Sequence, residues 1–141
     1  MANIKFVGFQ DSFEIPEGHE RLELHFEIKT TLDKDSAFSL ISIPGEISKW
    51  FFDIENLDPR AGGKVSFVNS DGSIKDAICT SMVLGKEFSL ISKEFGEAKF
   101  KVESKKAEVT IVVDFKLFTD ESKAATEIFE GFVSRLRALA V

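Results

Sequence analysis

Few side chains in this sequence have the types and spacing that chemistry needs. His19, Glu23 and His25 are its one cluster of metal-ligand types, and Glu23 and His25 share a strand face. Alternation across residues 21–30 turns that face toward solvent, and no second cluster completes a tetrahedral set of ligands. We therefore expect a solvated polar face here, with no bound metal and no cofactor.

Three further motifs lack the partners that catalysis requires. Cys79 lies mid-strand with no base paired to it by a motif, and a free cysteine is usually a small buried hydrophobe. Asp53 and Glu55 would share a face on a strand and could act as acid and base, but a nearby turn favours a solvated pair. Residues 62–64 lack the spacing of a phosphate-binding loop and indicate a tight turn. We expect no catalytic residues.

The whole-chain composition limits the classes of protein that remain. The 141 residues suit one domain, and 43% hydrophobic with 30% charged residues is ordinary for a soluble globular protein. The net charge of −6 argues against general binding to nucleic acid or to an anionic membrane. One cysteine, no membrane-length apolar run and an N-terminus unlike a signal peptide favour the cytoplasm.

The aromatic residues are strongly biased toward phenylalanine. The chain has 15 Phe, one Trp and no Tyr, so it carries large apolar volume with few hydroxyl groups. These rings can pack as an ordinary core, and they can also line an apolar pocket. The two interpretations are compatible.

The elements that would position these rings end in one long helix. Residues 121–141 carry apolar side chains three and four apart, which places them on one helix face. Thr119 or Asp120 can cap this helix. Because the chain before it is mostly strand, the helix must bury its face against a sheet.

Strands and two short helices precede the terminal helix. Alternation or turn chemistry predicts strands over residues 21–30, 64–69, 74–84, 87–92, 97–103 and 108–118, whereas residues 51–55 are either strand or a helix end. Asp33 can cap a helix beginning at Lys34, and Pro44 suits the first turn of a second helix that ends near Trp50. In the last strand Val112 opposes the inward face, so we expect it to be exposed.

Residues 1–20 read as an N-terminal arm that precedes a domain over residues 21–141. Residues 4–9 have strand propensity and are followed by the breakers Pro16 and Gly18. The arm could add an edge strand, or it could pair with a second copy of the chain as a homodimer.

The order of these elements resembles the helix-grip order of the START-like superfamily, also called Bet v 1-like or SRPBCC. Residues 35–41, followed by Pro44 and Trp50, look like the first-helix segment of that family. Residues 58–63, Asp-Pro-Arg-Ala-Gly-Gly, and then Phe67 look like the turn and hairpin of the branch related to the activator of Hsp90 ATPase. Many relatives carry Gly-Trp in the last helix, where this chain has Gly131 and Phe132.

The resemblance implies an α+β fold. Two short helices follow the first main strand, and a curved antiparallel sheet of about six or seven strands wraps around a long C-terminal helix. It also implies a cavity between sheet and helix that holds a small hydrophobic ligand, such as a lipid or an aromatic compound, without catalysis. Alternation and helix face suggest a lining of Phe26, Trp50, Phe67, Met82, Phe100, Phe115, Phe129 and Phe132. The alternatives are a module that binds a chaperone of the Hsp90 kind and, less favoured because Tyr is absent, a polyketide cyclase-like enzyme.

Overall fold

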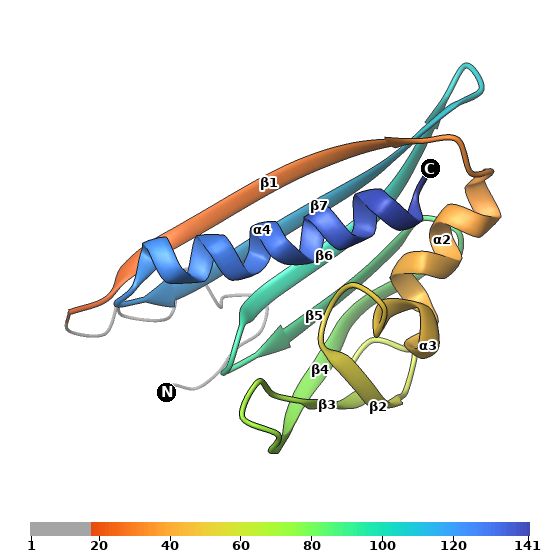
Figure 1. Cartoon of the computed structure of the whole chain (residues 1–141). Coiled ribbons are helices and arrows are strands. Elements are labelled where there is room, and N and C mark those ends of the chain that lie inside the picture. Colours follow the sequence, from red (N-terminus) through yellow and green to blue (C-terminus); the bar gives the residue numbers. More distant parts are fainter. Residues whose placement is uncertain (1–17) are drawn as a thin grey trace.

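The computed structural model describes residues 18–141, which form the predicted succession of strands and helices (Figure 1). The strands are β1 (Glu20–Thr30), β2 (Asp53–Leu57), β3 (Lys64–Val68), β4 (Ile74–Val83), β5 (Glu87–Ser92), β6 (Gly96–Lys105) and β7 (Glu108–Thr119). The helices are α2 (Lys34–Ser42), α3 (Pro44–Ile47) and α4 (Ser122–Leu139). The stretch whose type was left open, residues 51–55, therefore contributes to a strand. Most of the predicted N-terminal arm, residues 1–17, lies outside the described residues.

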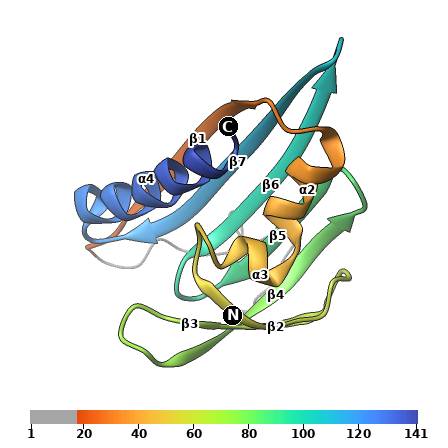
Figure 2. The same cartoon turned by 45° about the vertical axis from the view of Figure 1, so that its right-hand side comes forward.

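The seven strands form one antiparallel sheet in the order β1-β7-β6-β5-β4-β3-β2. Figures 1 and 2 show α4 running along β1 and β7, with α2 and α3 beside it on the same side of the sheet. This arrangement confirms the predicted α+β helix-grip fold. None of the described helices is long and apolar enough to cross a membrane.

The two short helices begin where their sequences indicate. The carboxylate of Asp33 accepts a hydrogen bond of 2.7 Å from the backbone N–H of Ser36, as expected of a helix cap. Pro44 occupies the first turn of α3, where its missing N–H costs nothing. Both helices bury apolar residues toward the sheet.

The start of α4 differs from the prediction. Neither Thr119 nor Asp120 caps it: the cap position is Glu121, which makes no capping side-chain hydrogen bond. The hydroxyl of Thr119 instead accepts from the N–H of Glu121 just before the helix. The buried face of α4 comprises Phe129, Phe132, Val133 and Leu136.

A β-bulge changes which side chains of β4 face the helices. The pairing of β4 with β5 shifts between Cys79 and Ser81. Uninterrupted alternation would group Met82 with Ile78, but the extra residue reverses the faces beyond the bulge. Ala77, Cys79 and Met82 therefore all pack toward the core, the first two buried and Met82 partly buried.

The predicted environment of Val112 is wrong. It was expected to be exposed on the outer face of β7, and it is only 5% exposed. Its neighbours in the register are Glu27 on β1 and Lys101 on β6. Alternation placed Val112 on the correct face, but it could not show that this face is covered.

Candidate ligand site

The space between the sheet and α4 is occupied by a connected set of aromatic rings, here called the aromatic cluster. Phe51 is its hub, with ring centroids 5.0 to 6.2 Å from those of six other rings. Such separations are typical of favourable edge-to-face and offset contacts. The members of the cluster are Phe26, Trp50, Phe51, Phe52, Phe67, Phe88, Phe95, Phe100, Phe115, Phe129 and Phe132.

Seven of the eight predicted lining residues belong to this cluster. Phe115 of β7 connects the strands to the helix, because its ring centroid lies 4.4 Å from Phe129 and 6.3 Å from Phe100. Phe67 joins through Phe52 and Phe95. The eighth residue, Met82, is partly buried against the same core. The structure thus brings the predicted residues together, and their role in holding a ligand stays a prediction.

Four rings of the cluster were missed from the sequence: Phe51, Phe52, Phe95 and, at its border on β5, Phe88. The first two follow Trp50 directly, in a stretch whose strand or helix character was unresolved, so no face could be assigned to them. Phe95 lies in the turn between β5 and β6, where periodicity gives no information. The run Trp50-Phe51-Phe52 was the available signal, because three consecutive large aromatic residues seldom all face solvent.

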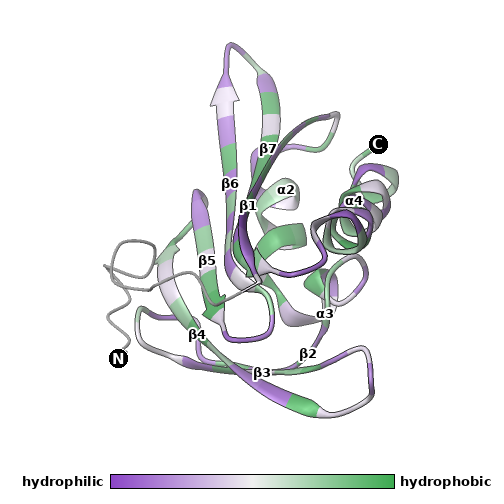
Figure 3. Ribbon diagram, turned by 90° about the vertical axis from the view of Figure 1, so that its left-hand side faces the viewer, coloured by the Kyte–Doolittle hydropathy of each residue, from purple (hydrophilic) through white to green (hydrophobic). Residues whose placement is uncertain are grey.

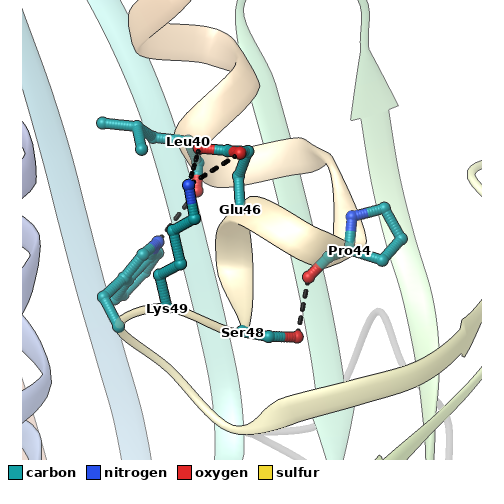
Figure 4. A network of polar contacts seen from close by, with 6 residues as sticks. Leu40, Pro44, Glu46, Ser48 and Lys49 are labelled. Atoms are coloured by element: carbon teal, nitrogen blue, oxygen red, sulfur yellow. Dashed lines mark hydrogen bonds and ion pairs between the residues drawn. The ribbon is translucent and has the colours of Figure 1, made fainter.

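Trp50 is held in place by a hydrogen bond to α2. Its indole Nε1 donates to the backbone carbonyl oxygen of Leu40 at 2.8 Å, and the side chain is fully buried. Figure 4 shows this region, where the hydroxyl of Ser48 also donates to the carbonyl oxygen of Pro44 and the ammonium of Lys49 meets Glu46. These contacts orient the segment from which Phe51 and Phe52 reach the cluster.

The cluster meets its surroundings at two half-buried rings. Phe52 is partly exposed, although it contacts Phe67, Phe95 and Phe132 at 5.0 to 5.6 Å. Phe26 on β1 is also partly exposed and contacts only the edge of the cluster, with its centroid 6.4 Å from that of Phe115. A small molecule reaching the cluster would therefore meet Phe52 or Phe26 first.

The interior around these rings is nearly free of ionisable groups. Within the described residues the buried hydrophobic core includes one titratable side chain, Cys79. Burial raises the pKa of its thiol, while its sulfur lies 3.4 Å from the carbonyl oxygen of Ser81. A raised pKa disfavours the thiolate that nucleophilic catalysis needs. The prediction that Cys79 is a buried hydrophobe is confirmed.

The polar residues singled out from the sequence lie away from the cluster. His25 is on the outer face of β1, where Nδ1 contacts Asp114 at 2.5 Å and Nε2 contacts Glu27 at 2.9 Å. No group of three or more metal-ligand side chains with suitable geometry occurs within residues 18–141. Asp53 and Glu55 are both exposed on β2.

Two hollows of about 330 and 340 Å³ lie near the β6–β7 hairpin. Both are lined mainly by charged and polar side chains, and they share Glu103 and Ser104. Neither hollow is lined by a member of the aromatic cluster, so neither is the predicted apolar site.

Comparison with known proteins supports the fold and little beyond it. No protein-family model matches the chain, and no curated protein matches its sequence. Among solved structures, the Aha1 dimer from Colwellia psychrerythraea superposes with a TM-score of 0.66 at 12% identity, covering 84% of this chain and 93% of that one. Protein NE0264 from Nitrosomonas europaea gives 0.64 at 15% identity, covering 84% and 93%. CalU16 from Micromonospora echinospora gives 0.55 at 11% identity, covering 86% and 82%.

The strand order, the two short helices and the terminal helix define a domain with the Bet v 1-like helix-grip fold. Within this class the chain is similar in structure to Aha1, as residues 58–63 and Phe67 suggested. At these identities the likeness establishes the fold alone.

Proposed function

We propose that this chain is a non-catalytic binding domain that takes a small, flat, apolar molecule into the aromatic cluster. The observation that carries the proposal is the position of Phe52. It is half-buried at the border of the cluster and contacts four rings that are almost fully buried. A ligand that displaces the Phe52 ring gains the same apolar and aromatic contacts.

The composition of the cluster determines the class of ligand. Apolar pockets bind ligands mainly through hydrophobic and aromatic side chains, with a few polar groups for orientation. Here the rings are Phe and one Trp, and the indole N–H of Trp50 is already bonded to Leu40. A charged or strongly polar ligand would lose its hydration without gaining a partner. An aromatic hydrocarbon-like molecule or a lipid chain meets no such penalty.

Ring-to-ring contact within the cluster sets a further condition on binding. Because neighbouring centroids are 4.4 to 6.4 Å apart, a ligand must replace existing contacts, which reduces its net affinity. We therefore propose modest affinity and a binding step that moves Phe52 or Phe51. Either movement would alter the surroundings of Trp50, whose centroid is 5.5 Å from that of Phe51.

The test is a titration of the purified protein with naphthalene, a polycyclic aromatic compound and a fatty acid, followed by Trp50 fluorescence and thermal denaturation. Saturable binding with an altered Trp50 emission and a raised midpoint supports the proposal. Phe52→Ala should strengthen that binding, because the ring that the ligand must displace is then absent, whereas Leu84→Ala, a truncation at an 88% exposed apolar position, should leave it unchanged. No saturable binding of any of the three probes to the wild-type chain would refute the proposal.

A protein-interaction module acting on a chaperone is the second candidate. It is favoured by the structural similarity to the Aha1 dimer and by the filled interior, which leaves the surface as the place of action. The corresponding test mixes the chain with Hsp90 and follows its ATPase rate, with the Bet v 1-like protein CalU16 as a fold control. An unchanged rate together with no complex on gel filtration would exclude this candidate. For either function we propose a cytoplasmic location, in keeping with the single cysteine.

A further inference from the structure

The outer face of the sheet, which points away from every described helix, has two different regions (Figure 3). On β1 it is polar and exposed, with Glu23, His25 and Glu27. On β5 the same face is buried, since Ser89 is 2% and Ile91 4% exposed. By contrast, the side chains of β1 that face α4, including Leu24, are only partly buried. The outer face of β5 is therefore more deeply buried than the face of β1 that lies beneath α4, although no described helix covers β5 on that side.

Five uncharged residues of this face make up what we call the outer patch: Ser89, Ile91 and Val112, which are buried, and Ile78 and Thr80, which are partly buried. Ile91 pairs directly with Ile78 across β4 and β5. The hydroxyls of Thr80 and Ser89 share a hydrogen bond of 2.8 Å, which satisfies both within the patch. The outer patch is therefore uncharged and internally satisfied in its side-chain hydrogen bonds, as expected for a surface that another apolar segment covers.

The outer patch is flanked by charged residues of both signs: Glu97 pairs with Ile91, and Glu27 pairs with Val112. Lys99 pairs with Ser89 in the register, and Lys101 pairs with Val112. Neither ammonium takes part in an ion pair among the described residues. The aliphatic stems of such lysines can cover part of the patch.

We propose that residues 1–17 of the same chain dock on the outer patch and cover it. Ser89 and Ile91 are buried although no second copy of the chain is present. The sequence of this segment suits the surface. It contains the apolar residues Ile4, Phe6, Val7, Phe9, Phe13 and Ile15, which match the uncharged patch.

The connection to β1 permits this docking. Ile91 pairs with Glu97, which pairs with Lys116, which pairs with Glu23. Ile91 is separated from the first residue of β1 by three strand spacings of about 4.8 Å across the sheet and by three residues of about 3.3 Å along β1. These two perpendicular displacements give a distance of roughly 17 Å. Seventeen extended residues span up to about 56 Å. The segment can therefore reach the whole outer patch and reverse direction once.

The experiment measures thiol labelling in the full-length chain carrying Ser89→Cys. Native Cys79 is fully buried, so its labelling in the same sample reports global unfolding. The double change Phe6→Asp and Phe9→Asp should speed the labelling of the new thiol at least tenfold while Cys79 stays unreactive. The matched control, Asn3→Asp with Gln10→Asp, adds the same two charges at polar positions of the segment and should change the rate less than twofold.

Two outcomes would overturn the proposal. One is a labelling rate that the Phe6 and Phe9 substitutions leave unchanged, which would mean that another part of the chain covers the patch. The other is protection of the introduced thiol from labelling that increases with protein concentration. That result would mean that a second copy of the chain covers the patch. Protection that is independent of concentration over a hundredfold range, and lost only in the Phe6 and Phe9 variant, supports intramolecular docking.

Discussion

The indole of Trp50 donates a hydrogen bond of 2.8 Å to the carbonyl oxygen of Leu40. In a continuing helix that oxygen would accept from the N–H of residue 44, but residue 44 is Pro44 and has none. Trp50 therefore supplies the donor that the proline removes. One side chain both completes the end of α2 and carries an aromatic ring into the cluster, which explains physically why Pro44 and Trp50 occur together.

Trp50→Phe should lower the free energy of unfolding by about 2–4 kcal/mol. The substitution leaves a buried carbonyl without a donor, which costs roughly 1–3 kcal/mol, and removes packed volume beside Phe100. Urea denaturation followed by circular dichroism measures the loss. Lys49→Ala is the control from the adjacent position, because it breaks only an exposed pair with Glu46 and should change stability by less than about 0.5 kcal/mol. Equal effects of the two substitutions would contradict this role of Trp50.

Phe129→Ala should destabilise the domain by about 3–5 kcal/mol, the usual cost of deleting a buried phenylalanine ring. Its ring lies 4.4 Å from Phe115 and 5.6 Å from Phe132, and the side chain is 4% exposed. The neighbouring residue Ile128 is 55% exposed, and Ile128→Ala should cost less than about 1 kcal/mol. Chemical denaturation of both variants provides the comparison. Similar losses would mean that α4 does not grip the sheet through Phe129.

Periodicity and turn chemistry predicted most of the architecture because each strand and helix has one apolar face. They failed where a local irregularity or a distant segment decides the outcome. The bulge beside Cys79 adds one residue to β4, and no pattern in the sequence marks it. The burial of Val112 depends on what covers the outer face of the sheet, which alternation does not describe. Phe51 is the hub of the cluster because the segment between α3 and β2, which has no apolar periodicity, folds toward the core.

Gly96→Ala should be far more destabilising than Gly72→Ala, although both glycines have positive φ, +77° and +87°. A Cβ on Gly96 would lie 2.2 Å from the carbonyl oxygen of Lys116 and 2.8 Å from the Cβ of Leu117. A Cβ on Gly72 meets no atom within 4 Å, so that substitution incurs only the backbone cost of about 1–2 kcal/mol. We expect a difference of at least about 2 kcal/mol in thermal or urea unfolding. A difference below about 0.5 kcal/mol would show that β6 and β7 separate easily at this point.

His25 lies between two carboxylates on the outer face of the sheet, one from its own strand and one from β7. Asp114 is its partner in the register of β1 and β7, while Glu27 is two residues along β1 on the same face. Hydrogen bonds to Glu27 and Asp114 raise the pKa of the imidazole above its ordinary value of 6.5, because both favour the protonated ring.

The raised pKa of His25 should make the stability of the domain depend on pH. Since the folded chain binds this proton more tightly than the unfolded chain, the contribution is fully present below pH 6.5. It is lost as the pH rises from 6.5 through the folded pKa. Asp114→Asn should bring the imidazole midpoint, followed by NMR, back toward 6.5 and flatten the stability profile in that window. His25→Gln should remove this pH dependence, whereas Glu55→Gln, an exposed change on the distant strand β2, should preserve it. A wild-type midpoint at or below 6.5 would show that the two carboxylates do not hold the proton.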